Sequence, residues 1–362
     1  MMKHNHKEDL FKTVSLSPFK YLTPSVRTKA YFLLFALLPQ IVMLFVTESF
    51  ASLTILLASV LASILAEAAD FGKNRTDLFL WTIAVVRGAL IGLLIPSNFP
   101  PVAVFFVAFI VIFVNRSVLG GFAKSWLNPV ALTVVVCWLV GMRLFPPLLV
   151  TLDDLQSRNP ALSLIHDGAF PMLSLDARIT NFLNNNVFGS LGVSIPDGYV
   201  SMFWDTKSPI PAFRFNLITI LTSIVLFSFD VYNVMIPGIF LAVYAVLVRF
   251  VAPFIYDGPA MQGDVILAML SSGTVFCVLF LLQWYGTVPL MNRGKFIYGA
   301  VGGVIAFCIV GVGTSSAGFV FTILLLNVLS PLIQTVENYF EKKYTESVIA
   351  AKVKKVAEGA SV

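Results

Sequence analysis

Apolar residues gather along this chain in ten runs of about membrane-spanning length. A helix needs about 20 apolar residues to cross the hydrocarbon core of a bilayer, and fewer where a segment enters and turns back. The fold class that we expect is therefore an all-α polytopic membrane protein of about ten transmembrane helices. These lie near residues 30–48, 50–69, 77–96, 101–115, 129–150, 215–231, 234–254, 264–284, 296–313 and 317–336.

One long polar stretch, residues 151–213, separates the fifth run from the sixth. It contains six aspartates against three basic residues, and an acidic loop belongs on the outer side of a membrane. With an even number of spans both chain ends lie on the same side, and both ends are rich in lysine. The charge pattern predicts cytoplasmic termini, because positively charged segments stay inside.

These features divide the chain into five parts. We expect a cytoplasmic segment over residues 1–29, a first five-helix repeat over 30–150, an extracytoplasmic loop over 151–213, a second five-helix repeat over 214–336 and a cytoplasmic tail over 337–362. The first part is polar and lacks the apolar region and cleavage site of a signal peptide, so we expect no processing there.

The composition agrees with a membrane protein. Of the 362 residues, 58% are hydrophobic and 12% are charged, with a mean hydropathy of +0.88, whereas soluble proteins carry about 25% charged residues. The net charge of +5 resides mostly at the ends and in short turns, which positive-inside topology explains better than nucleic-acid binding. Single cysteines at 137, 277 and 308 lack the spacing of a metal site or disulfide framework, and we expect them to be packing residues.

The two sets of five segments share weak similarities at matching places. TDLFLWTIAVVRGALIG in the third segment and GDVILAMLSSGTVF in the eighth each place an aspartate before an apolar run that glycine interrupts. GGFAKSWLNPVAL, after the fourth segment, has a counterpart in AGFVFTILLLNVLSPLI of the tenth. Because five is odd, the second set runs through the membrane in the opposite sense. We therefore expect two inverted five-helix repeats with a substrate path between them.

The candidate functional residues are polar side chains in apolar surroundings, since the sequence contains no nucleophilic triad, phosphate loop or zinc spacing. Arg87 stands halfway along the third segment, where a charge costs at least about 2.5 kcal/mol unless it is paired. It either contacts an anion or cofactor phosphate, or gates an ion path, or forms a structural pair with Glu67. We expect Glu67 to be a solvated residue near its helix end, and Asp77 and Asp264 to cap helix N-termini.

Two glycine-containing motifs, GGFAKSWLNP and SSGT, interrupt the apolar pattern. Small residues let helices approach closely, and interrupted helices expose backbone groups that can hold an ion or a ring-shaped ligand. The alternative is tight helix packing alone. In both cases we expect the two halves to meet at these motifs. The residues concerned are Gly120, Gly121, Asn128, Pro129, Ser271, Ser272, Gly273 and Thr274.

From about residue 77 to 340, the chain resembles the RnfD/NqrB family: the D subunit of Rnf electron-transfer complexes and the B subunit of sodium-translocating NADH:quinone reductase. GGFAKSWLNPVAL resembles the family's Gly-Gly…Asn-Pro-Ala turn. GDVILAMLSSGTVF, NRGKFIYGAVGGVIAF and LLLNVLSPLIQ resemble its Leu-x-Ser-Gly-Thr-x-Phe, Asn-Lys-Gly-Lys and Asn-x-x-x-Pro-Leu-Ile segments. The resemblance implies a urea-transporter-like fold in a complex of the bacterial inner membrane. That complex couples electron transfer to sodium or proton export, and its other subunits are membrane proteins and flavin- or iron–sulfur-bearing proteins.

The outer loop contains a departure from this family. Family members carry Ser/Asp-Gly-Ala-Thr there, and the threonine receives FMN through a phosphoester bond. In this chain DGAFPM places Asp167, Gly168, Ala169 and Phe170 at the motif, and phenylalanine has no hydroxyl. Covalent FMN at position 170 is excluded, which makes the motif a degenerate flavin site and leaves non-covalent binding as the one way in which this site could hold FMN or riboflavin. The family's Ala-Thr-Asp-Pro carboxylate is also missing before Asn292.

These departures leave three functional interpretations. In the one that we favour, the chain is a membrane subunit of an Rnf/Nqr-like ion-translocating oxidoreductase complex, which relays electrons through a non-covalent flavin or leaves the relay to a partner. In the second, the fold serves as a transporter or channel for a small solute, such as a flavin. In the third, the chain is a scaffold for redox partners. The candidate site is the cleft between the halves, lined by Arg87 and the two glycine motifs.

Overall fold

The computed structural model is a bundle of helices and describes most of the chain. The described residues are 24–69, 78–121, 124–146, 150, 155, 160–168, 170–192, 194–261, 263–312 and 315–359, and they contain no β-strand. Five helices in this part are long and apolar enough to cross a membrane, and four shorter apolar helices accompany them. The all-α class is confirmed.

The described residues before the long polar stretch form five α-helices. They are α1 (Val26–Val46), α2 (Phe50–Ala68), α3 (Leu78–Leu94), α4 (Pro101–Ser117) and α5 (Pro129–Val140). α1 begins earlier than its apolar run because Ser25 caps it, accepting a hydrogen bond from the Thr28 amide at 3.2 Å. The helix therefore starts in the polar lead-in, where hydropathy alone gives no signal.

The second half contains both continuous and interrupted helices. They are α10 (Asn216–Ser228), α11 (Met235–Val246), α12 (Ala252–Ile255), α13 (Val265–Ser271), α14 (Thr274–Phe280), α15 (Asn292–Val310) and α16 (Gly318–Gly359). A π-helical turn joins α11 to α12. The eighth apolar segment is not one helix, because α13 ends at Ser271 and α14 begins at Thr274.

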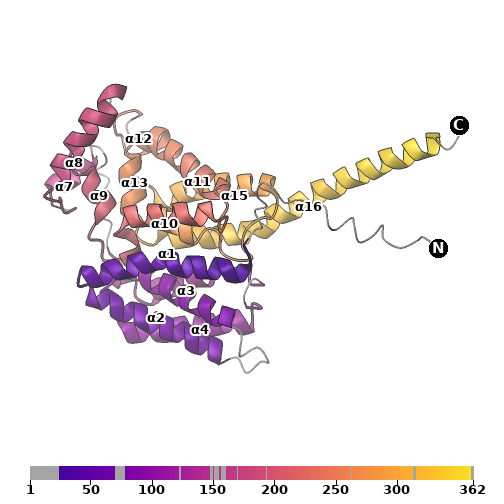
Figure 1. Cartoon of the computed structure of the whole chain (residues 1–362), viewed down its shortest axis with the longest axis horizontal. Coiled ribbons are helices and arrows are strands. Elements are labelled where there is room, and N and C mark those ends of the chain that lie inside the picture. The colour runs from indigo at the N-terminus through magenta and orange to yellow at the C-terminus, as the bar shows by residue number, and fades with distance from the viewer. Residues whose placement is uncertain are drawn as a thin grey trace, which may run out of the picture.

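The long polar stretch folds into short helices at one end of the molecule. They are α7 (Pro160–His166), α8 (Asp176–Leu183) and α9 (Tyr199–Trp204), and Figure 1 shows them at the end opposite the C-terminus. The fully buried carboxylate of Asp176 accepts hydrogen bonds from the Gly198 and Ser201 amides, both at 2.7 Å. This carboxylate joins the start of α8 to the start of α9.

The helices of the two halves form two groups that lie against each other (Figure 1). α1 packs on α10, and the contact contains a polar pair: Gln40 Nε2 donates to Thr219 Oγ1 at 2.5 Å and to the Phe215 carbonyl at 3.3 Å. Within the first group, Ser59 Oγ of α2 donates to the Gly88 carbonyl of α3 at 2.8 Å. Small residues thus bring these backbones close together, as is typical of membrane helices.

Candidate functional site

Arg87 lies in a buried ion cluster that links three helices. Its Nη2 atom lies 3.1 Å from Glu67 Oε2 of α2, and its Nε donates to Ser63 Oγ at 3.1 Å. Arg116 of α4 pairs with the other carboxylate oxygen of Glu67. The Arg87 and Glu67 side chains are only 6% and 7% exposed, so the cluster replaces water as the partner of these charges.

This cluster bears on the expectations for Glu67 and for Arg87. Glu67 is not a solvated residue at a helix end, because two guanidinium groups enclose its carboxylate. The structural pairing of Arg87 with Glu67 is confirmed. Breaking a buried pair by removing one partner costs about 3–5 kcal/mol, so the cluster fixes α2, α3 and α4 relative to one another.

The GGFAKSWLNP motif forms the connection from α4 to α5. Gly120 and Gly121 adopt left-handed backbone conformations, with φ of +89° and +74°. Asn128 caps α5, because its side-chain oxygen accepts from the Val130 amide at 2.9 Å. Its Nδ2 atom donates to the Leu281 carbonyl after α14, at 3.0 Å. Asn128 therefore connects the first half of the chain to the second.

The SSGT motif is the interruption between α13 and α14. Gly273 has φ +68°, and a Cβ atom there would lie within 3.0 Å of three ring atoms of Phe213. The hydroxyls of Ser271 and Ser272 donate to carbonyls one turn back, at 2.7 and 2.6 Å, and Ser272 Oγ lies 2.6 Å from Thr274 Oγ1. All four residues of the motif belong to a tightly packed break in a helix.

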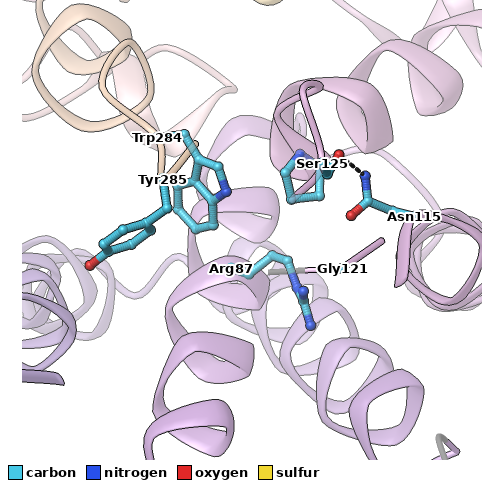
Figure 2. A pocket seen from close by; sticks show the side chains of 7 residues that line it. Arg87, Asn115, Gly121, Ser125, Trp284 and Tyr285 are labelled. Carbon is cyan, nitrogen blue, oxygen red and sulfur yellow. Dashed lines mark hydrogen bonds between the residues drawn. The ribbon is translucent and has the colours of Figure 1, made fainter. Parts of the chain in front are cut away.

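A small pocket lies where the halves meet near Arg87. Figure 2 shows Trp284 and Tyr285 on one side, Asn115 and Ser125 on the other, and Arg87 below. Its lining consists of Arg87, Asn115, Gly121, Ser125, Pro129, Trp284 and Tyr285.

Three of the predicted site residues, Arg87, Gly121 and Pro129, thus line one pocket. Gly120 and Asn128 are their chain neighbours, whereas the SSGT residues are not part of this lining.

The chemistry of the pocket suits a small polar or anionic group. Arg87 uses Nε and Nη2 for Ser63 and Glu67, and its Nη1 has no hydrogen bond among the described residues. The N-terminus of α5 adds a partial positive charge beside Pro129. The space is on the order of one water molecule. A three-ring isoalloxazine does not fit this pocket in the conformation described.

Sequence reasoning missed four residues of this pocket. Asn115 ends the fourth apolar segment, and its Nδ2 donates to Ser125 Oγ at 2.9 Å. Trp284 and Tyr285 belong to the LLQWYG sequence, which differs from the family pattern. Two signals in the sequence could have indicated these residues. Asn115 is a polar residue at the end of an apolar run, and Trp284 and Tyr285 are an aromatic pair after an interrupted helix.

The DGAF segment, Asp167 to Phe170, lies among the loop helices. Asp167 and Gly168 are exposed, and Ala169 lies outside the described residues. Phe170 is 2% exposed and belongs to the hydrophobic core. Position 170 thus offers neither a hydroxyl nor an accessible surface to a cofactor phosphate.

Asp264 is a helix cap, as expected. Its side chain accepts from the Leu267 amide at 2.9 Å at the start of α13, and Tyr199 Oη of α9 donates to it at 2.7 Å. Burial, together with the charge and hydrogen bond of Asp264, raises the pKa of Tyr199 above its usual value. The other expected cap, Asp77, lies outside the described residues.

A comparison with known protein families shows the family of this chain. The model of the NQR2, RnfD, RnfE family matches residues 13–342. The chain belongs to this family. The match includes the ion cluster, both glycine motifs and the loop helices of this NQR2, RnfD, RnfE family protein.

Curated relatives of this family member are D subunits of proton- or ion-translocating oxidoreductase complexes. The D subunit of a proton-translocating ferredoxin:NAD(+) oxidoreductase complex from Clostridium ljungdahlii is 22% identical, over 90% of this chain and 94% of that protein. The D subunit of an ion-translocating oxidoreductase complex from Buchnera aphidicola is 25% identical, over 94% of this chain and 97% of that protein. The corresponding protein from Actinobacillus pleuropneumoniae serotype 7 is 24% identical, over 72% and 79%.

Proposed function

We propose that this chain is an integral membrane subunit of an Rnf/Nqr-like ion-translocating oxidoreductase complex, which couples electron transfer to export of sodium ions or protons. The family match over residues 13–342 carries this proposal, and near full-length similarity to the D subunits of such complexes supports it. The apolar helices provide the membrane body that the role requires.

Purification through a tag on this chain tests the proposal. The expected result is a complex that contains flavin- and iron–sulfur-bearing subunits. In sealed vesicles, this complex should move sodium ions or protons when an electron donor and an electron acceptor are both supplied, and cells lacking the chain should lose that movement. A chain that purifies alone and transports a solute without electron transfer would contradict the proposal and support the transporter interpretation.

The finer architecture is also part of the proposal. We infer ten spans in two inverted five-helix repeats, over residues 30–150 and 214–336, with both termini in the cytoplasm and the loop outside. The grouping of the helices into two packed sets supports it (Figure 1), as does the interrupted helix of the second half, a feature of inverted-repeat transporters. Membrane-impermeant labelling of cysteines placed at exposed Asp167 and at Glu346 tests the orientation. Labelling from the outside at 167 and only from the inside at 346 is the expected result.

The proposed working site is the meeting point of the halves. Arg87, Gly120, Gly121, Asn128 and Pro129 surround or adjoin the pocket, and the Asn128 bond to the Leu281 carbonyl links the halves there. The SSGT break lies at the start of α14, the helix that ends next to Leu281. In an assembled complex, Asn128→Ala should lower ion movement per electron transferred. A purely structural role would instead lower the amount of complex and leave this ratio unchanged.

The electron relay is assigned to flavins on partner subunits. Phe170 lacks the attachment oxygen, and the small pocket does not accommodate a flavin ring. Absorption and fluorescence spectra of the purified chain, before and after denaturation, combined with its intact mass, test this assignment. A colourless chain of unmodified mass is expected. Flavin released on denaturation would show that the chain holds FMN or riboflavin non-covalently, and a mass gain would show another attachment residue.

A further inference from the structure

Helix α8 in the loop turns two polar side chains, Asp176 and Thr180, toward the protein. The Asp176 carboxylate binds the amides of Gly198 and Ser201, and the Ser201 hydroxyl also donates to it. Directly after the helix, the side chain of its C-cap residue Asn184 exchanges two hydrogen bonds with the backbone of Ile195, at 2.9 and 2.8 Å. The inward face of this segment is therefore polar and hydrogen-bonded.

Large apolar side chains lie on a different side of α8 and of its N-cap residue Leu175, about 110° around the helix from the buried Asp176 and Thr180. Leu175, Ile179 and Phe182 are 54%, 40% and 62% exposed. At about 100° per residue these three side chains fall within an arc of about 60°. The adjoining exposed arc contains Arg178 and Asn181, which are polar. The circumference of α8 is thus divided into a protein-facing polar arc, an exposed polar arc and an exposed apolar arc.

A helix in a water-soluble loop buries its apolar side and exposes its polar side. In contrast, α8 exposes its apolar side chains and buries two polar ones. An exposed apolar patch marks contact with a membrane or a partner. Figure 1 shows α8 running across the direction of the long helices, at the end opposite the C-terminus. The turn between α1 and α2 lies at the same end, because Arg214 from the end of the loop donates to Ser49 in that turn at 2.7 Å.

We propose that α8 is an interfacial helix that lies in the surface of the bilayer. Leu175, Ile179 and Phe182 occupy the boundary between headgroups and acyl chains, and Arg178 and Asn181 face the headgroup phosphates and water. Such helices bury their apolar side about 5–10 Å into this boundary. α8 runs across the direction of the long helices and lies at the level of the turn between α1 and α2. A helix in this position lies along a membrane surface. The polar arc beside the apolar one provides the water-facing side that an interfacial helix needs, and Arg178 provides a charge-assisted donor for lipid phosphate.

Spin-label accessibility in the full-length chain tests this inference independently of the proposed function. Cys137 and Cys277 are buried, and exposed Cys308 is replaced by serine. Phe182→Cys and its neighbour Asn181→Cys then give one label on each exposed arc, with Ile179→Cys and Arg178→Cys as a second matched pair. The chain is reconstituted in phosphatidylethanolamine–phosphatidylglycerol vesicles, and collision with lipid-soluble oxygen is compared with collision with a water-soluble nickel chelate.

The expected oxygen-to-nickel ratio is several-fold higher at 182 and 179 than at 181 and 178. Equal, water-like ratios at all four positions would overturn the proposal, because the apolar arc would then face solvent. Protection of 182 and 179 from both reagents would also overturn it, because protein rather than lipid would cover this arc.

Discussion

Replacing Gly273 by alanine should destabilise the chain for two separable reasons. Alanine at φ +68° costs about 1–2 kcal/mol, because the left-handed region crowds a Cβ atom. The added methyl group also enters the ring of Phe213, and overpacking of a filled core costs about 1–3 kcal/mol. The expected total is about 2–5 kcal/mol, a large share of the roughly 5–15 kcal/mol that stabilises a folded protein.

Two control glycines separate these contributions. Gly168 has φ +77° with no atom within 4 Å of the added Cβ, so Gly168→Ala should show only the backbone cost. Gly238 lies inside α11 with the same open space and no positive φ, so Gly238→Ala should be neutral or stabilise by up to about 1 kcal/mol. The order of destabilisation should be Gly273, then Gly168, then Gly238.

The measurement is SDS-induced unfolding of the purified variants in mixed micelles, followed by tryptophan fluorescence. A Phe213→Ala change in the Gly273→Ala background completes a double-mutant cycle. The double variant should be about 1–3 kcal/mol more stable than the sum of the two single losses, because the collision is then absent. Equal losses at Gly273 and Gly168, or strict additivity with Phe213→Ala, would refute the reasoning.

Three further changes test the contacts at the site and the loop. Glu67→Gln should cost about 3–5 kcal/mol in the same assay, because two arginines lose their buried carboxylate; a loss under about 1 kcal/mol, as for a surface pair, would contradict this. Asn128→Ala should cost more than Asn128→Ser, because serine keeps the α5 cap, worth about 0.5–2 kcal/mol, while both lose the bond to Leu281. The folded protein favours the neutral form of Tyr199, and its pKa is therefore raised. The free energy of unfolding should fall as the pH rises above about 10, the pKa of an unfolded tyrosine, toward the pKa of the folded state. Tyr199→Phe should flatten that alkaline decline, and an unchanged slope would show that the titration of Tyr199 does not contribute to it.

The sequence predicted the apolar segments well because hydropathy and length are local properties of the chain. The break at SSGT was also foreseeable, since glycine beside small residues interrupts a helix without any knowledge of its neighbours. The earlier start of α1 was not foreseeable from hydropathy, because Ser25 caps the helix within a polar stretch.

Side-chain contacts between helices were harder to predict than the helices themselves. The position of Glu67 near a helix end indicated solvation, whereas the packing of α2 against α3 and α4 places two arginines around it. Trp284 and Tyr285 reach the pocket because the backbone turns after α14, and no periodic pattern describes such a turn. Arg87 was identified because a charge inside an apolar run is visible without tertiary structure.

The length of α16 has a consequence for the C-terminal end of the chain. A helix of 42 residues is about 63 Å long, roughly twice the thickness of a bilayer core. The C-terminal part of α16 extends beyond the bundle in Figure 1. Glu337 still contacts the bundle through the Gly294 amide, and the residues after it, 338–359, correspond to about 33 Å of helix. A reporter fused after this helix would stand at a distance from the bilayer that is set by the length and tilt of the helix. Changes in its distance to the lipid would then measure tilting of the second group of helices during turnover, with the helix serving as a rigid pointer.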